Sequence, residues 1–278
     1  MTALDRWRNQ LEAWAIPEPI VAAAAESPYG FPTALFRNRG ELGADAGADP
    51  TALRALEAVP HGGRVLDVGC GGGATSLPLA GRAGVVVGVD AQEDMLDGFL
   101  ANARAAGVGA EVVHGRWPDV ADRVAPVDVA VAGHVLYNVP SLEPFARALL
   151  RVTRSRVVLE LTEHHPLLWM NDLWLRFHGL QRPDGPTVDD AVAALAELGT
   201  RPTVDRWRAP PRPGGFERRA DAVALVRRRL CLSPELDEEI GEALGDRLRR
   251  REDLWGAGPA DRGLATIWFD LTPRAARP

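Results

Sequence analysis

Residues 64–73 read Arg-Val-Leu-Asp-Val-Gly-Cys-Gly-Gly-Gly, and this stretch decides the fold. Its first five residues form a short apolar run, which predicts a buried parallel strand. The glycines that follow let the backbone turn sharply and let a ligand come close, because no Cβ is in the way. A second apolar run, residues 85–89, ends in Asp90, which lies 21 positions after Gly69. The sequence therefore predicts a βαβ unit whose second strand carries a carboxylate placed to bind a ribose.

Two classes of cofactor fit this glycine turn. Gly69, Gly71 and Ala74 satisfy the dinucleotide fingerprint G-x-G-x-x-G/A. Asp67 separates the two classes, because we expect it at the carboxyl end of the first strand, beneath the turn. A carboxylate there repels a pyrophosphate and attracts a cationic ammonium or sulfonium group. The turn therefore favours a cationic cofactor.

The same residues resemble a known family motif. Asp67, Gly69, Gly71 and Gly73 are similar to motif I (D-x-G-x-G-x-G) of the class I S-adenosylmethionine-dependent methyltransferases, and Asp90 matches the second motif of that family. The resemblance covers residues 52–161 and implies S-adenosylmethionine as the cofactor. It also places adenine contacts in the loop at residues 114–118, although this chain has Arg116 where the family usually has an acid. The expected cofactor-binding residues are Asp67, Gly69, Gly71, Asp90, Ala91, Arg116, Trp117, His134 and Tyr29.

The order of the predicted elements indicates an α/β fold. We expect a seven-stranded, mostly parallel, doubly wound sheet with helices on both faces, and the resemblance implies an antiparallel last strand. The expected strands are 64–68, 85–90, 111–113, 127–132, 156–161, 203–207 and 265–271. The expected helices are 4–15, 51–59, 74–81, 93–105, 142–150, 187–198, 217–230 and 234–251.

The domain organisation expected from the sequence has two parts. Residues 1–50 form an N-terminal helical segment in which Tyr29 and Phe31 are candidates for a lid over the cofactor. Residues 51–278 form a Rossmann-like domain with a lid insertion at about 163–186. A helical stripe of apolar residues in that insertion is compatible with a lid helix or with an ordinary core helix; it comprises Leu168, Trp169, Leu173, Trp174 and Phe177.

Composition limits the function further. The formal net charge is -6, and acids lie close to the arginine runs at 227–229 and 249–251, so we expect no nucleic-acid partner. Cys70 and Cys231 are too few for a disulfide framework, and no segment is long and apolar enough for a membrane span, so we expect a cytoplasmic protein without membrane contact. All 32 basic residues are arginine. The absence of lysine excludes Schiff-base chemistry and the Tyr-Lys pair of many dehydrogenases.

Methyl transfer requires chiefly that the acceptor be aligned with the methyl group. A base is needed only when the acceptor must lose a proton. The candidates for that base follow the predicted carboxyl ends of strands four and five; they are His134, His164, His165 and, more weakly, Tyr137. His134 has an alternative role, in which its backbone carbonyl contacts the cofactor ammonium group.

Two subclasses of the family are disfavoured. Enzymes that methylate amino groups of bases or glutamine carry (N/D)-P-P-(Y/F) after strand four, where this chain has Gly133-His134-Val135-Leu136. Metal-dependent enzymes of the catechol type need acids at that strand end, whereas Asp128 lies at its start, so we expect no metal. The resulting hypothesis is methylation of a small-molecule acceptor at oxygen or nitrogen.

Three rival functions stay open at this point. They are a nicotinamide-dependent oxidoreductase, a catalytically silent protein that binds a cofactor or a partner, and a methyltransferase acting on RNA or protein. The sequence leaves the oligomeric state open, with a homodimer as one option.

Overall fold

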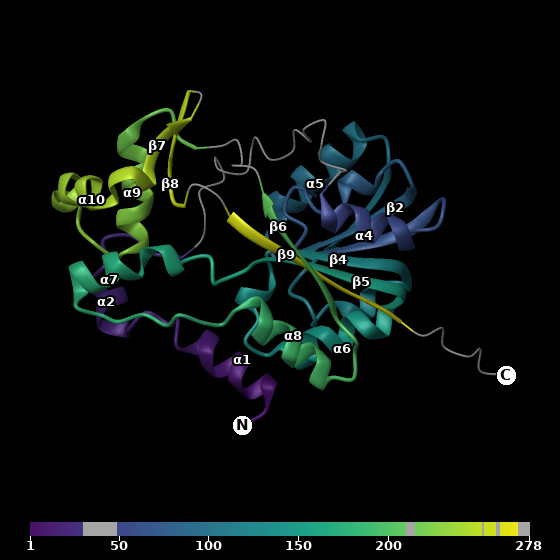
Figure 1. Ribbon diagram of the computed structural model, residues 1–278. Helices are drawn as coiled ribbons and strands as arrows, with labels where there is room; N and C mark the ends of the chain where they lie inside the picture. The colour runs from purple at the N-terminus through teal and green to yellow at the C-terminus, as the bar shows by residue number, and fades with distance from the viewer. Residues whose placement is uncertain (30–48, 210–214, 252, 260–261, 272–278) are drawn as a thin grey trace.

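The protein is built on one large sheet (Figure 1). The computed structural model describes residues 1–29, 49–209, 215–251, 253–259 and 262–271. Its seven-stranded sheet has the order β3-β2-β1-β4-β5-β9-β6. The strand β9 runs antiparallel to both of its neighbours, β5 and β6, while the other pairs are parallel, which confirms the expected fold. The strands are β1 (Gly63–Val68), β2 (Ala83–Asp90), β3 (Gly109–His114), β4 (Val127–Gly133), β5 (Thr153–Thr162), β6 (Thr203–Ala209) and β9 (Arg262–Asp270).

Helices cover both faces of this sheet. The helices α4 (Pro50–Ala58) and α5 (Glu93–Ala105) pack on one face, and α1 (Ala3–Glu12), α6 (Leu142–Val152) and α8 (Val188–Glu197) pack on the other. Successive side chains of a strand point to opposite faces. Val65 therefore packs in the core with α4 and α5, and Leu66 packs in the core with α1, α6 and α8. Because the central strands are buried on both faces, they read as continuous apolar runs.

The N-terminal helix belongs to one of these cores. Trp7 is fully buried, and its indole N–H donates to the carbonyl oxygen of Val139 at 2.9 Å. Thr2 begins the helix with a capping box in which its side chain accepts from the backbone N–H of Asp5. Thr187 and Asp190 form a capping box at the start of α8 in the same way.

The helix expected at 74–81 after the glycine turn is wrong. The chain makes turns there and only a single 3₁₀ turn, Leu77–Leu79. The Leu77 N–H does donate to the Gly73 carbonyl at 2.9 Å, as an α-helix requires. The next residue is Pro78, which has no N–H to continue the ladder. The turn therefore leads into a compact loop instead of a helix.

A second group of elements forms its own hydrophobic cluster beside the sheet (Figure 1). It includes Met170, Trp174, Val223 and Ile240. We call this group the cap; its elements are α2 (Glu18–Ala23), α7 (Asn171–His178), α9 (Arg219–Arg229), α10 (Asp237–Leu244), β7 (Leu248–Arg251) and β8 (Leu254–Ala257). The cap is thus larger than the insertion expected at 163–186, because residues from three parts of the chain share its core.

The second charged helix is shorter than the sequence suggested. It ends at Leu244, and residues 248–251 form a strand of the β7–β8 hairpin. Gly245, with a φ of 50°, follows the last helical residue. Members of both arginine runs pair with acids: Arg227 lies 3.0 Å from both Glu26 and Asp237, and Arg250 lies 3.3 Å from Asp253. Among the described helices, none has both the length and the apolar character needed to cross a bilayer.

Candidate active site

The glycine turn between β1 and β2 leaves open space at its tip. Gly69, Gly71 and Gly73 all have positive φ values, of 68°, 49° and 89°. A Cβ on Gly69 would lie 2.6 Å from Cγ2 of Val135, whereas a Cβ on Gly71 would meet no atom within 4 Å. Gly69 therefore lets the turn pack against the loop after β4, and Gly71 faces the space that a ligand would fill.

This pair of glycines gives a matched test of the turn. Both Gly69→Ala and Gly71→Ala force alanine into a left-handed conformation, which costs about 1–3 kcal/mol. Only Gly69→Ala adds a clash, so we expect it to lower the free energy of unfolding by about 1–3 kcal/mol more than Gly71→Ala does. Urea unfolding of the two variants without cofactor measures the difference. Equal losses would show that Val135 moves away without cost.

Asp90 is fixed beside that open space by two backbone groups. One carboxylate oxygen accepts from the Gly71 N–H and the other from the Gln92 N–H, both at 3.0 Å. Each oxygen has a second lone pair, so the carboxylate can accept two further hydrogen bonds. The neighbouring Ala91 is exposed, and its carbonyl oxygen lies 3.2 Å from Nε2 of His114. The side chain of Asp90 is thus oriented before any ligand arrives.

Asp67 lies beneath the turn and is 1% exposed. One of its oxygens accepts from the Ser76 hydroxyl at 2.6 Å, and the other has no hydrogen-bond partner among the described residues. The pKa of this carboxyl is raised to about 7, chiefly by burial and also by the negative charge of Asp90, while hydrogen bonds from Ser76 oppose the rise. An unsatisfied buried carboxylate next to a second acid favours a cationic group in this turn over a phosphate.

The raised pKa of Asp67 makes stability depend on pH. The folded protein holds this proton more tightly than the unfolded chain, so its contribution to the free energy of unfolding falls as pH rises from about 4 to about 7. In Asp67→Asn this loss is absent. Without cofactor, we therefore expect the free energy of unfolding of Asp67→Asn to exceed that of the wild type by about 4 kcal/mol at about pH 8. At about pH 4 we expect little difference. Urea unfolding at both pH values measures it, and a pH-independent difference would contradict it.

His134 and Glu160 form a pair at the carboxyl ends of β4 and β5. Nε2 of His134 lies 3.0 Å from a carboxylate oxygen of Glu160, and the His134 backbone N–H donates to the Glu160 carbonyl at 2.7 Å. His134 has a φ of 60°, a strained conformation for a residue other than glycine. Its side chain keeps 31% of its surface exposed, whereas that of Glu160 keeps 9%. The imidazole is therefore held by a buried acid and still reaches solvent.

Glu160 is itself held by a buried chain of hydrogen bonds. Its second carboxylate oxygen accepts from the Thr51 hydroxyl at 2.7 Å. That hydroxyl lies 2.7 Å from the Thr266 hydroxyl, which accepts from the Trp207 indole at 3.1 Å. Sequence reasoning missed Glu160 and its partners. The available signal was a single acid in the otherwise apolar run Val157-Val158-Leu159-Glu160-Leu161 of β5.

The other predicted bases have different surroundings. His165 is buried, stacks on Trp14 with ring centres 3.7 Å apart, and has its pKa lowered to about 3 because burial disfavours its charged form. Tyr137 is buried, donates to the Thr162 carbonyl at 2.8 Å, and has a pKa raised by burial. His164 is exposed and forms an isolated bridge with Thr187.

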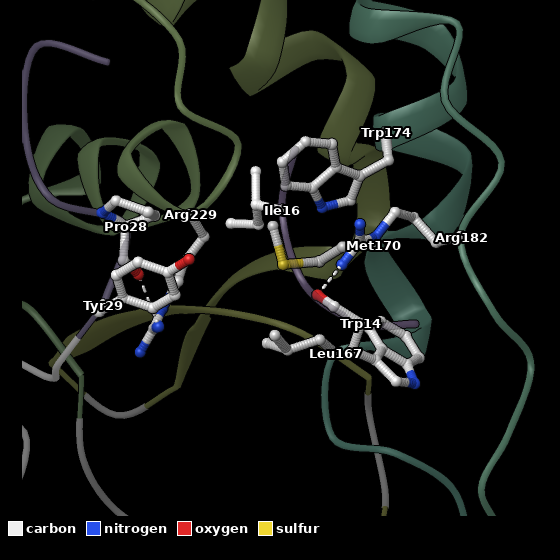
Figure 2. A pocket seen from close by; sticks show the side chains of 9 residues that line it. All are labelled: Trp14, Ile16, Pro28, Tyr29, Leu167, Met170, Trp174, Arg182 and Arg229. Atoms are coloured by element: carbon white, nitrogen blue, oxygen red, sulfur yellow. Dashed lines mark hydrogen bonds between the residues drawn. The ribbon is translucent and has the colours of Figure 1, made fainter. Parts of the chain in front are cut away.

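Three residues expected near the cofactor lie in separate places. Arg116 is exposed in the loop after β3. Trp117 packs against the core that contains α6, and its indole donates to the Phe145 carbonyl at 3.1 Å. Tyr29 is 58% exposed and lines a cavity in the cap with Trp14 and Trp174 (Figure 2). Phe31, the second lid candidate, lies outside the described residues. The structure thus gathers Asp67, Gly69, Gly71, Asp90 and Ala91 at one turn and leaves Tyr29 in the cap.

Across the residues that the structure describes, no three or more His, Cys, Asp or Glu side chains gather as metal ligands would. The His164–His165 pair does not converge, because His165 is buried against Trp14 while His164 is exposed.

Known proteins resemble this chain in sequence. Residues 65–156 match a family model described as a methyltransferase domain. The chain is 28% identical to the ubiquinone biosynthesis O-methyltransferase of Agrobacterium fabrum over 200 residues, which cover 65% of this chain and 78% of that protein. It is 36% identical to the protein of that name from Azorhizobium caulinodans over 101 residues, which cover 36% of this chain and 38% of that protein.

Solved structures resemble the chain in fold. The YcgJ protein from Bacillus subtilis superposes with a TM-score of 0.52 at 17% identity and covers 79% of this chain and 97% of its own. A structure that concerns the conversion of a disulfide bond into a thioacetal group during echinomycin biosynthesis gives a TM-score of 0.51 at 18% identity, covering 84% and 86% of the two chains. At these identities the likeness concerns the fold alone.

Proposed function

Because this chain contains a class I S-adenosylmethionine-dependent methyltransferase domain, we propose that it transfers the cofactor's methyl group to an oxygen or nitrogen atom of a small organic molecule. The observation that carries the proposal is the glycine turn, where the unsatisfied Asp67 and the preoriented Asp90 flank the open space at Gly71. The relatives named as ubiquinone biosynthesis O-methyltransferases favour oxygen over nitrogen as the accepting atom.

The residues of the turn suit the cofactor's two polar ends. Asp90 would accept hydrogen bonds from the ribose hydroxyls, through the lone pairs that Gly71 and Gln92 do not use. Asp67 would attract the cationic part of the cofactor through its charge. Gly69 and Gly71 would let the backbone approach the ligand. When bound, the cofactor supplies an activated methyl group on a positively charged sulfur.

His134 is the group best suited to remove a proton from the acceptor. Its side chain is partly exposed at the carboxyl end of β4, and Glu160 fixes its ring through Nε2. A proton held on Nε2 by the carboxylate makes Nδ1 the basic nitrogen. Glu160 also stabilises the imidazolium that forms when Nδ1 takes up a proton. Glu160 therefore acts as a positioning residue, and His134 as the base.

His165 and Tyr137 are more plausible as wall residues. A histidine whose pKa lies at about 3 is a weak base at neutral pH. The Tyr137 hydroxyl is occupied by the Thr162 carbonyl, and its ring stacks on Trp7 with ring centres 5.8 Å apart. Both rings would instead shape the space beside His134.

Two measurements test the proposed function. Calorimetry with S-adenosylhomocysteine and with NAD(P) separates the methyltransferase from the oxidoreductase; we expect binding of the first only, and binding of NAD(P) alone would overturn the proposal. Transfer of label from S-adenosylmethionine to a panel of phenols and amines, with a chelator present, tests the metal-independent reaction. Tight cofactor binding without label transfer to any acceptor would favour the silent binding protein. Salt-dependent retention on RNA would favour the RNA methyltransferase.

A further inference from the structure

The cap contains a small cavity of about 70 Å³ next to the proposed site (Figure 2). Its wall includes Trp14, whose ring stacks on His165. His165 in turn meets the edge of Tyr137, with ring centres 5.3 Å apart, in the loop that follows β4. The cavity therefore lies on the side of the sheet where strands β4 and β5 end, and two layers of rings separate it from that loop.

Arg182 lines this cavity and is 6% exposed. Its guanidinium donates to the carbonyl oxygens of Trp14 and, at 3.0 Å, Ala15. It lies 5.4 Å over the Trp14 ring and 5.0 Å over the Trp174 ring. Its Nε is buried without a hydrogen-bond partner. Figure 2 shows the guanidinium reaching across Met170 toward the Trp14 carbonyl.

Arg182 differs from the other buried arginines of the described residues in lacking an acidic partner. Two other arginines of the described chain are buried to a similar degree, and both have acids: Arg156 pairs with Glu57 and Asp270, and Arg227 pairs with Glu26 and Asp237. Within the described residues, no acid lies at ion-pair distance from Arg182. Carbonyl groups and ring faces offset only part of the cost of burying a charge, and an anion would offset more. Burial lowers the pKa of Arg182, which is consistent with an incompletely compensated cation.

The rest of the wall restricts the class of anion. Leu167, Met170 and Ile16 present apolar groups to the cavity, and Arg229 stands at its opposite side (Figure 2). The cavity has about half of the roughly 150 Å³ that holds a benzene molecule in another protein, which suits a carboxylate group but not a whole aromatic ring. We propose that Arg182 binds the carboxylate of an organic acid whose apolar body lies against Leu167 and Met170.

The test compares acids with neutral amides of the same shape. Benzoate, benzamide, hexanoate and hexanamide are titrated into the full chain with and without S-adenosylhomocysteine, by calorimetry and by tryptophan fluorescence. We expect at least one acid to bind at least about tenfold more tightly than its amide. Equal affinities, or no binding of either acid, would overturn the site. Because the titration is also run without cofactor, a failure of cofactor binding and a failure of the carboxylate site are seen separately.

Substitutions of Arg182 test whether this residue causes the preference for acids over amides. We expect Arg182→Gln to abolish the preference for acids and Arg182→Lys to keep part of it. The matched control is Arg176→Gln, which removes an exposed arginine of α7 that pairs with Glu239 at 3.1 Å and should leave the preference unchanged. Retention of the preference in Arg182→Gln would overturn the proposal.

A second variant covers the case in which Arg182→Gln does not fold, since Arg182 also holds the Trp14 and Ala15 carbonyls. Leu167→Trp fills the cavity and leaves Arg182 in place, so it should abolish acid binding and preserve binding of S-adenosylhomocysteine. Unchanged acid binding would overturn the site.

Discussion

Turnover of the His134→Ala variant is expected to fall about 10²- to 10⁴-fold with an acceptor that must lose its proton. The reason is that His134 is the partly exposed imidazole at the end of β4 that a buried carboxylate orients. Affinity for S-adenosylhomocysteine should stay within a few-fold of the wild type, because the ring is assigned to the acceptor and not to the cofactor. Single-turnover kinetics and calorimetry measure the two quantities separately.

The matched control for His134 is His164→Ala. His164 also follows a strand end, but it is exposed, so we expect nearly unchanged turnover. Glu160→Gln should lower turnover less than His134→Ala, and it should shift the pH dependence of kcat to lower pH, because the negative charge that stabilises the imidazolium is lost. If His134→Ala leaves turnover unchanged, or if it removes cofactor binding as well, the base assignment fails. In the former case the backbone carbonyl of residue 134, which the substitution keeps, would be the functional group.

Cofactor affinity of the Asp90→Ala variant is expected to fall by a few kcal/mol, which corresponds to about ten- to several-hundred-fold. The carboxylate is an ionised acceptor that two backbone N–H groups orient toward the open space at Gly71. Hydrogen bonds to a charged acceptor are stronger than neutral ones, so losing two of them to the ribose carries a large cost. Calorimetry with S-adenosylhomocysteine measures the effect.

Asp97→Ala is the matched control for Asp90→Ala. It removes an exposed acid of α5 only seven positions further along the chain, and we expect cofactor affinity to remain that of the wild type. Equal losses in the two variants would indicate a general effect of net charge. Unchanged affinity in Asp90→Ala would refute the ribose role.

The sheet was predictable from sequence because its strands are buried on both faces. Val85-Val86-Val87 and Val129-Ala130-Val131 have no polar face, and glycine or acidic residues mark where such runs end. The positions of Asp67 and Asp90 relative to the glycines then followed from the βαβ unit. The glycine turn of the site could therefore be located without coordinates.

Other parts of the site depend on contacts that are distant in sequence. Glu160 meets His134 only because β4 and β5 are neighbours in register, with Gly133 opposite Glu160. Thr51 and Thr266 lie 109 and 106 positions from Glu160, so no local pattern joins them to it. The helix expected at 74–81 fails for a local reason, since the chain carries a proline one position after the first helical hydrogen bond. The extent of the cap was missed because its core combines residues 16–24, 167–180 and 216–257, which lie far apart in the sequence.

Residues 1–16 bind two distant parts of the chain, the loop after β4 and the segment before α8, and this affects the order in which the chain can fold. The Trp7 indole is bound to the carbonyl of a residue 132 positions later, and the Trp14 indole to the carbonyl of Gly185, 171 positions later. Trp7 and Trp14 are therefore synthesised long before Val139 and Gly185, and both must wait for these partners. Closing contacts of such long range is slow. Until then Trp7 and Trp14 remain exposed to other proteins, so the nascent chain is most prone to aggregate during this interval.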